Sequence, residues 1–125
     1  MKRAGQTNKL TAVILWFFTT SYMGLIFYLS SQSQLLPPLI HGTDKIIHTL
    51  VYFILAILLY FSFLKSGLRK HILLISLVFA VIYGVSDEIH QYYVPGRIAS
   101  IGDVIADSLG ALLGSFLAAR LSSYR

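Results

Sequence analysis

The side chains of this sequence that could carry out chemistry are carboxylates and imidazoles spaced three or four residues apart. Asp44 precedes His48 by four residues, and Asp87 precedes His90 by three. In a helix, residues at these spacings lie on one face. Such pairs can act as general acid and base, accept hydrogen bonds from a bound headgroup, or ligate a metal ion.

Acid and base catalysis is one use of these residues. The candidates are Asp87, Glu88, His48 and His90. Two carboxyl groups can divide the two roles when their environments differ. Against a paired role, neighbouring residues of a helix point about 100° apart, so Asp87 and Glu88 would face different surroundings.

Binding of a headgroup is a second use. The candidates are Arg97, Asp44, Lys45, Gln91, Asp103 and Asp107. Arg97 offers a planar fork of donors to an anionic group, and it follows Pro95-Gly96, which predicts a turn back toward the last apolar segment. An ordinary ion pair between Arg97 and Asp103 explains the same residues equally well. Ser100, three residues before Asp103, has the spacing of a helix cap.

A metal site is a weaker interpretation. His48, His90, Glu88 and Asp103 are residue types that bind Zn²⁺. The compact H-E-x-x-H spacing is absent, and these ligands would have to converge from three helices. The sequence contains no Cys, which excludes thiolate ligands and disulfides. We therefore expect no metal and no cofactor.

The segments that must position these residues are long and apolar. Of the 125 residues, 56% are hydrophobic and only 12% are charged, which is far from the balance of a soluble domain. Apolar runs cover about 10–29, 46–64, 72–91 and 100–121. At about 1.5 Å per residue each can cross a hydrocarbon core of roughly 30 Å. We predict an all-α bundle of four transmembrane helices that forms a single domain over 1–125.

The first run could instead be a cleaved signal peptide, because Lys2, Arg3 and Lys9 precede it. Its apolar stretch is longer than a typical h-region, and no A-x-A site follows it. We expect this helix to be retained.

The basic residues predict how the bundle lies in the membrane. Eight of the ten flank the same ends of the predicted helices: Lys2, Arg3, Lys9, Lys65, Arg69, Lys70, Arg120 and Arg125. Short cytoplasmic loops hold the excess of Lys and Arg, so both termini are predicted to be cytoplasmic. All five acidic residues then fall in the outer half, and the polar site faces outward. Because the positive charge adjoins apolar runs, it indicates anionic lipid rather than nucleic acid.

Asp107 is the deepest of the acids. It lies seven residues beyond Ser100, which is about 10 Å along a helix. An ionised carboxylate facing lipid there would cost about 2.5–3.5 kcal/mol, so Asp107 must face inward, pair or be protonated. Gly110 and Gly114 share its face and form a small-residue stripe that admits a close neighbour. We favour packing within the bundle over a dimer face, and the oligomeric state stays open.

The order of these motifs resembles the VanZ family over about 10–121. The matching pieces are Asp44-Lys45-x-x-His48, Tyr83-Gly84, Asp87-Glu88-x-His90-Gln91, Val94-Pro95-Gly96-Arg97, Asp103, Gly110 and Gly114. The resemblance implies a multi-pass protein of the bacterial cell membrane, in a family named for low-level resistance to the glycopeptide teicoplanin. Where this sequence has Asp107 the family commonly has Asn, which favours a hydrogen-bonding role there over a role that needs charge.

Three classes of function stay open. The protein could be a membrane enzyme acting on an envelope lipid or cell-wall precursor, a binding or accessory protein that alters access of a glycopeptide to its target, or a proton or ion pathway. The pathway is the weakest, because the ionisable groups within the spans occupy one half of the membrane. Expected partners are membrane lipids and an envelope precursor or glycopeptide, with no nucleic acid.

Overall fold

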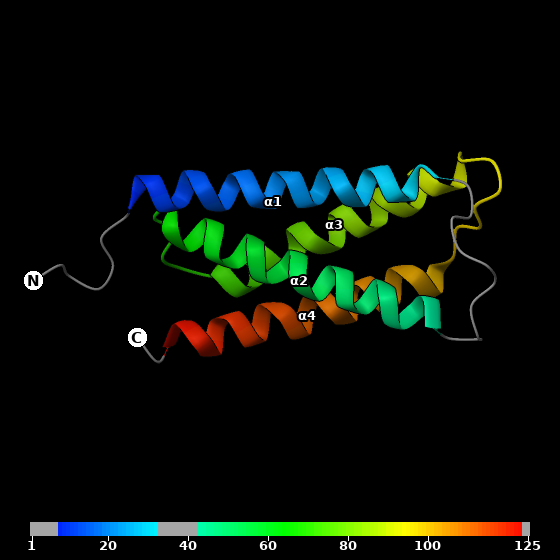
Figure 1. Ribbon diagram of the computed structural model, residues 1–125. Coiled ribbons are helices and arrows are strands. Elements are labelled where there is room, and N and C mark those ends of the chain that lie inside the picture. Colours follow the sequence, from blue (N-terminus) through cyan, green and yellow to red (C-terminus); the bar gives the residue numbers. More distant parts are fainter. Residues whose placement is uncertain (1–7, 33–42, 124–125) are drawn as a thin grey trace, which may run out of the picture.

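The computed structural model describes residues 8–32 and 43–123, and in these it contains four helices (Figure 1). They are α1 Lys9–Ser30, α2 Thr43–Lys65, α3 Ile72–Tyr92 and α4 Ile101–Ser123. Each is long and apolar enough to cross a membrane. The prediction of an all-helical fold with four candidate membrane spans is confirmed.

Some predicted features lie outside the described residues. These are the basic residues Lys2, Arg3 and Arg125. Within the described part, α1 begins and α4 ends at the same end of the bundle (Figure 1). The described basic residues at this end are Lys9, Lys65, Arg69, Lys70 and Arg120.

Close packing of α4 on α2 forms the centre of the bundle. A Cβ added at Gly110 would overlap the carbonyl group of Thr49, and one added at Gly114 would overlap that of Phe53. Only glycine lets the two backbones come this close. The small-residue stripe therefore joins two helices of one chain, as the sequence predicted.

Polar contacts fasten α1 to α2 in the half of the bundle nearer the basic end. The buried hydroxyls of Thr19 and Ser62 are 2.8 Å apart, and the Trp16 indole donates to the Ser66 hydroxyl at 2.8 Å. In the described part of the chain α1 packs against α2 and α3 and not against α4. The carboxylates of α4 therefore face α2 and α3.

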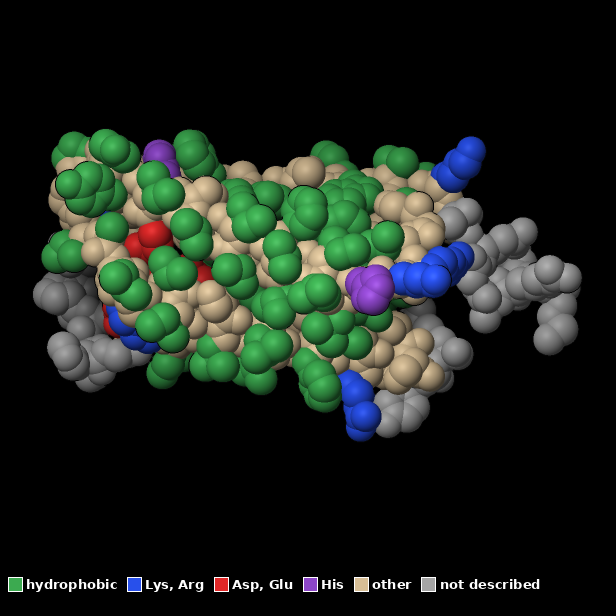
Figure 2. Space-filling model, turned by 180° about the vertical axis from the view of Figure 1, so that it is seen from behind, with side chains coloured by type: hydrophobic (Ala, Val, Ile, Leu, Met, Phe, Trp, Pro, Cys, Tyr) green, Lys and Arg blue, Asp and Glu red, His purple; other side chains and the backbone are tan. Residues whose placement is uncertain are grey.

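Apolar side chains cover the outer surface of the bundle (Figure 2). Most of the Lys and Arg side chains in this view stand at one end, and carboxylates with a basic side chain beside them show between apolar side chains near the other. This surface is typical of a protein surrounded by lipid, in which the polar groups turn inward.

The chain turns sharply between α3 and α4. The Arg97 amide donates to the Val94 carbonyl at 3.2 Å, and Gly96 has a φ of 81°. Pro followed by Gly with positive φ is the pattern of a type II turn. At the start of α4 the Ser100 hydroxyl accepts from the Gly102 amide at 3.1 Å, which is the cap that the sequence predicted.

Candidate functional site

A chain of ionisable groups joins α2 to α4. His48 Nδ1 lies 2.9 Å from Asp107 Oδ1, and His48 Nε2 lies 3.8 Å from Asp103 Oδ2. The Lys45 ammonium pairs with Asp103 and also lies 3.2 Å from Asp44 Oδ2. Asp103 and Asp107 are buried, whereas Asp44 is exposed. Asp107 thus faces inward and pairs, as its depth in the membrane required.

Helix periodicity and one glycine make room for this chain. Residues four apart share a face, so Asp103 and Asp107 both turn toward His48. On α3, a Cβ added at Gly84 would lie 3.1 Å from Asp107 Oδ2 and 3.2 Å from Tyr52 Cε1. A larger residue at Gly84 would push Asp107 away from α3.

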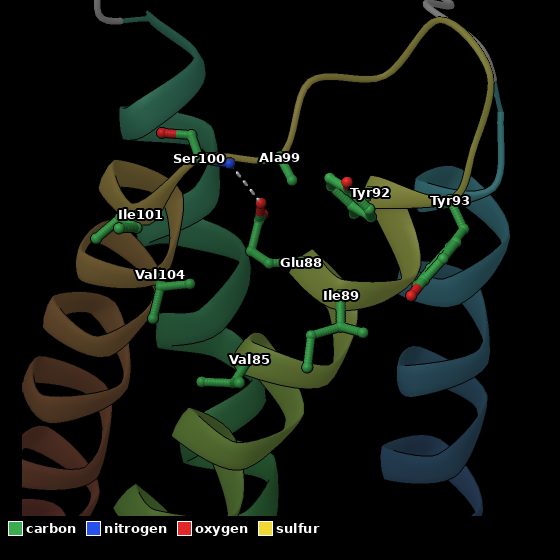
Figure 3. A pocket seen from close by; sticks show the side chains of 9 residues that line it. All are labelled: Val85, Glu88, Ile89, Tyr92, Tyr93, Ala99, Ser100, Ile101 and Val104. Atoms are coloured by element: carbon green, nitrogen blue, oxygen red, sulfur yellow. Dashed lines mark hydrogen bonds between the residues drawn. The ribbon is translucent and has the colours of Figure 1, made fainter.

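Glu88 brings α3 to the same place. Its Oε2 accepts a 3.0 Å hydrogen bond from the Ser100 amide, which ties α3 to the start of α4 (Figure 3). Its Oε1 is buried and has no hydrogen-bond partner among the described residues. One potential ligand atom each from His48, Glu88 and Asp107 lie within 4.8 Å of one another. Of the four metal-ligand candidates named from the sequence, the structure brings His48 and Glu88 together in this group. Its third member is Asp107, in place of His90 and Asp103.

Asp87 belongs to a separate polar contact between α3 and α1. The Ser30 hydroxyl donates to Asp87 Oδ1. The Gln91 amide lies 3.3 Å from both Asp87 Oδ2 and the Ser30 hydroxyl. All three residues are buried. Asp87 and Glu88 thus face different helices, as their angular separation on α3 predicts.

His90 also lies on the α1 side of α3. Its ring stacks on Phe27 with centroids 4.4 Å apart, and its Nε2 lies 2.8 Å from the Ser31 hydroxyl. The two imidazoles His48 and His90 therefore contact different helices.

Arg97 sits in the turn before α4 and is half-buried. Its Nε is buried without a hydrogen-bond partner among the described residues. Within 43–123, the lysine that pairs with Asp103 is Lys45, and no ion pair joins Arg97 to Asp103. The structural ion pair between Arg97 and Asp103, which the sequence offered as an alternative, is therefore not formed in the described part of the chain.

A pocket of about 410 Å³ opens between α3 and α4 (Figure 3). Its apolar lining is Val85, Ile89, Ala99, Ile101 and Val104. Glu88 and Ser100 supply its polar groups, and the highly exposed Tyr92 and Tyr93 complete its lining. An apolar pocket with a few polar groups is the usual form of a small-molecule site.

A family model described as VanZ/LLP1 matches residues 4–122. The chain belongs to the VanZ family. No curated protein matches it, and neither does any solved structure.

Three features of this VanZ site were not identified from the sequence. Ser30 and Ser31, at the end of the first apolar run, contact Asp87 and His90. Their position at the polar end of that run was the available signal. The pocket between α3 and α4 was not predicted either, because its apolar side chains have the pattern of ordinary lipid-facing residues.

The VanZ site supports two kinds of chemistry. A carboxylate beside a histidine orients the imidazole, as in many general bases. Unpartnered buried carboxylate oxygens accept hydrogen bonds or ligate cations. The four acid and base candidates do not form one group, because Asp87 and His90 face α1 while His48 and Glu88 lie among α2, α3 and α4.

Proposed function

We propose that this VanZ-family protein acts at the outer face of the bacterial cell membrane by binding an amphiphilic envelope molecule, either a lipid or a lipid-linked cell-wall precursor. Binding would change the access of a glycopeptide such as teicoplanin to its target. The observation that carries the proposal is the pocket between α3 and α4, whose walls are apolar and which contains the Glu88 carboxylate.

The apolar part of the pocket suits a hydrocarbon chain. Val85 and Ile89 line it from α3, and Ile101 and Val104 line it from α4 (Figure 3). The pocket is in the size range of about 300–1,000 Å³ that is common for small-molecule sites. Tyr92 and Tyr93 at its edge are residues that favour the membrane–water interface. An amphiphile can therefore enter with its chain in the bilayer and its headgroup near the loop.

The polar part of the pocket suits a headgroup with hydroxyl groups. Glu88 lines the pocket, and a carboxylate accepts hydrogen bonds from hydroxyl groups. Arg97, in the turn above, would bind a phosphate or other anionic part of the same headgroup through its planar fork. Binding without catalysis is supported by the separation of Asp87 and His90 from His48 and Glu88.

Filling the pocket tests the proposal. Val104→Trp adds bulk to the α4 wall of the pocket, whereas Leu112→Trp adds the same kind of bulk to an exposed position of the same helix. Native mass spectrometry of the purified proteins would compare the lipids that remain bound. Teicoplanin tolerance would be measured in cells that make equal amounts of each protein.

We expect Val104→Trp to lose the bound lipid and the tolerance, and Leu112→Trp to keep both. Equal lipid binding by the two variants would contradict use of the pocket. Lipid loss with unchanged teicoplanin tolerance would separate lipid binding from glycopeptide resistance.

A further inference from the structure

Three potential metal ligands converge where α2, α3 and α4 meet. His48 comes from α2, Glu88 from α3 and Asp107 from α4, and one potential ligand atom of each lies within 4.8 Å of the other two. Imidazole nitrogen and carboxylate oxygen are the donors of many Zn²⁺ sites.

Two oxygens of this group have no hydrogen-bond partner among the described residues. They are Glu88 Oε1 and Asp107 Oδ2, and both are buried. Glu88 is 5% exposed and Asp107 is 0% exposed. A buried carboxylate oxygen without a partner costs free energy, and binding of a cation offsets that cost.

The charges around this group also favour a bound cation. Four carboxylates are buried at this end of the bundle, namely Asp87, Glu88, Asp103 and Asp107. Among the described residues, the basic side chains in ion-pair contact with them are Lys45 and His48, and neither pairs with Glu88. Buried carboxylates are normally paired with cations or bound to metals.

We infer that His48, Glu88 and Asp107 bind one divalent transition-metal ion, for which Zn²⁺ fits the donor set best. Zn²⁺ binds nitrogen and oxygen ligands at about 2.0–2.2 Å in tetrahedral geometry, which places neighbouring donor atoms roughly 3.3–3.5 Å apart. The donor atoms, which lie within 4.8 Å of one another, would have to approach by up to roughly 1.5 Å to reach that spacing. Mg²⁺ suits the group less, because it prefers oxygen ligands and octahedral geometry.

The groups around the ligands already hold them in place. The Ser100 amide holds Glu88 Oε2 and leaves Oε1 free, and Gly84 leaves space beside Asp107 Oδ2. Contacts of this kind orient ligands in metal sites. Three protein ligands leave a fourth position for water or for an oxygen of a bound molecule.

Metal binding goes beyond the proposed function and can be tested without it. The full chain would be purified in detergent through a tag without histidine, stripped with a chelator, and dialysed against Zn²⁺. Bound metal would be counted by mass spectrometry, and affinity measured by calorimetry with Mg²⁺ in excess. We expect one Zn²⁺ per chain.

Substitutions identify the ligands. Glu88→Gln and Asp107→Asn keep the size of each side chain but remove its charge. We expect each to weaken Zn²⁺ binding by more than the roughly 10–100-fold loss typical of an outer-shell contact. His90→Gln and His71→Gln are controls outside the triad, because His90 stacks on Phe27 of α1 and His71 is exposed at the other end of the bundle, and both should bind like the wild type.

The helical circular dichroism spectrum and the elution volume must match the wild type before a loss of binding is assigned to a ligand. If a ligand variant does not fold, X-ray absorption at the zinc edge of the wild type decides the matter. A nitrogen and oxygen shell that includes one imidazole supports the site. Absence of stoichiometric Zn²⁺ in the folded wild type, or equal binding by the ligand variants and the controls, would overturn it.

Discussion

His48 Nδ1 lies 2.9 Å from Asp107 Oδ1, although the two residues are 59 positions apart in the sequence. The contact joins α2 to α4 deep in the helical bundle. It gives the Asp107 carboxylate a hydrogen-bond partner, which lipid chains could not provide. Asp107 itself is completely buried. The pair is therefore expected to contribute to the stability of the bundle.

We predict that Asp107→Asn is close to wild type in stability, because an amide oxygen can still accept from His48. Asp107→Leu should lower the free energy of unfolding by about 1–3 kcal/mol, since it removes the hydrogen-bond partner of the partly buried His48 imidazole. Thermal unfolding of the purified proteins in the same detergent measures both. Equal losses in Asn and Leu variants would show that charge, rather than the hydrogen bond, stabilises the contact.

Gly110 gives a prediction about helix packing. Gly110→Ala should separate α2 from α4, because the added Cβ would overlap the Thr49 carbonyl. Overpacking of this kind costs about 1–3 kcal/mol and sometimes more. Gly24→Ala is the matched control, since nothing lies within 4 Å of a Cβ there. A thermal midpoint that falls as little for Gly110→Ala as for Gly24→Ala would contradict the close approach.

The four helices could be predicted from the sequence because membrane spanning depends on length and hydropathy, which are local properties. The runs 10–29 and 72–91 differ from α1 and α3 by at most one residue at each end. The inward orientation of Asp107 could also be predicted, since an ionised group facing lipid is costly whatever the neighbours are.

The partner of each polar residue could not be predicted in the same way. Helix periodicity places Asp87 and Glu88 on different faces, but it does not say which face meets α1. That choice depends on the rotation of each helix, which is set by packing contacts such as Gly110 on Thr49. His90 therefore stacks on Phe27, and the pocket beside Glu88 became visible only in the structure.

The distribution of basic residues gives a third prediction. Lys65, Arg69 and Lys70 join α2 to α3 at the end where α1 begins and α4 ends. Short loops rich in Lys and Arg stay in the cytoplasm. Reporter fusions at the N-terminus and at the C-terminus should both report a cytoplasmic location. A reporter that is active outside at either terminus would contradict the orientation and the outward-facing site together.

Arg97 provides a prediction about headgroup binding. Its place in the turn after Pro95 and Gly96, and its Nε without a partner in the described residues, support a role in holding an anionic group. Arg97→Lys should then lower teicoplanin tolerance nearly as much as Arg97→Ala, because Lys keeps the charge but loses the planar fork. Lys70→Ala, in the loop at the opposite end, serves as the control for loss of a positive charge. The tolerance of each strain would be measured at equal protein amounts, determined by immunoblotting of membranes. Wild-type tolerance in both Arg97 variants would exclude the anchoring role, whereas a fall in the amount of both proteins would assign Arg97 to folding of the loop.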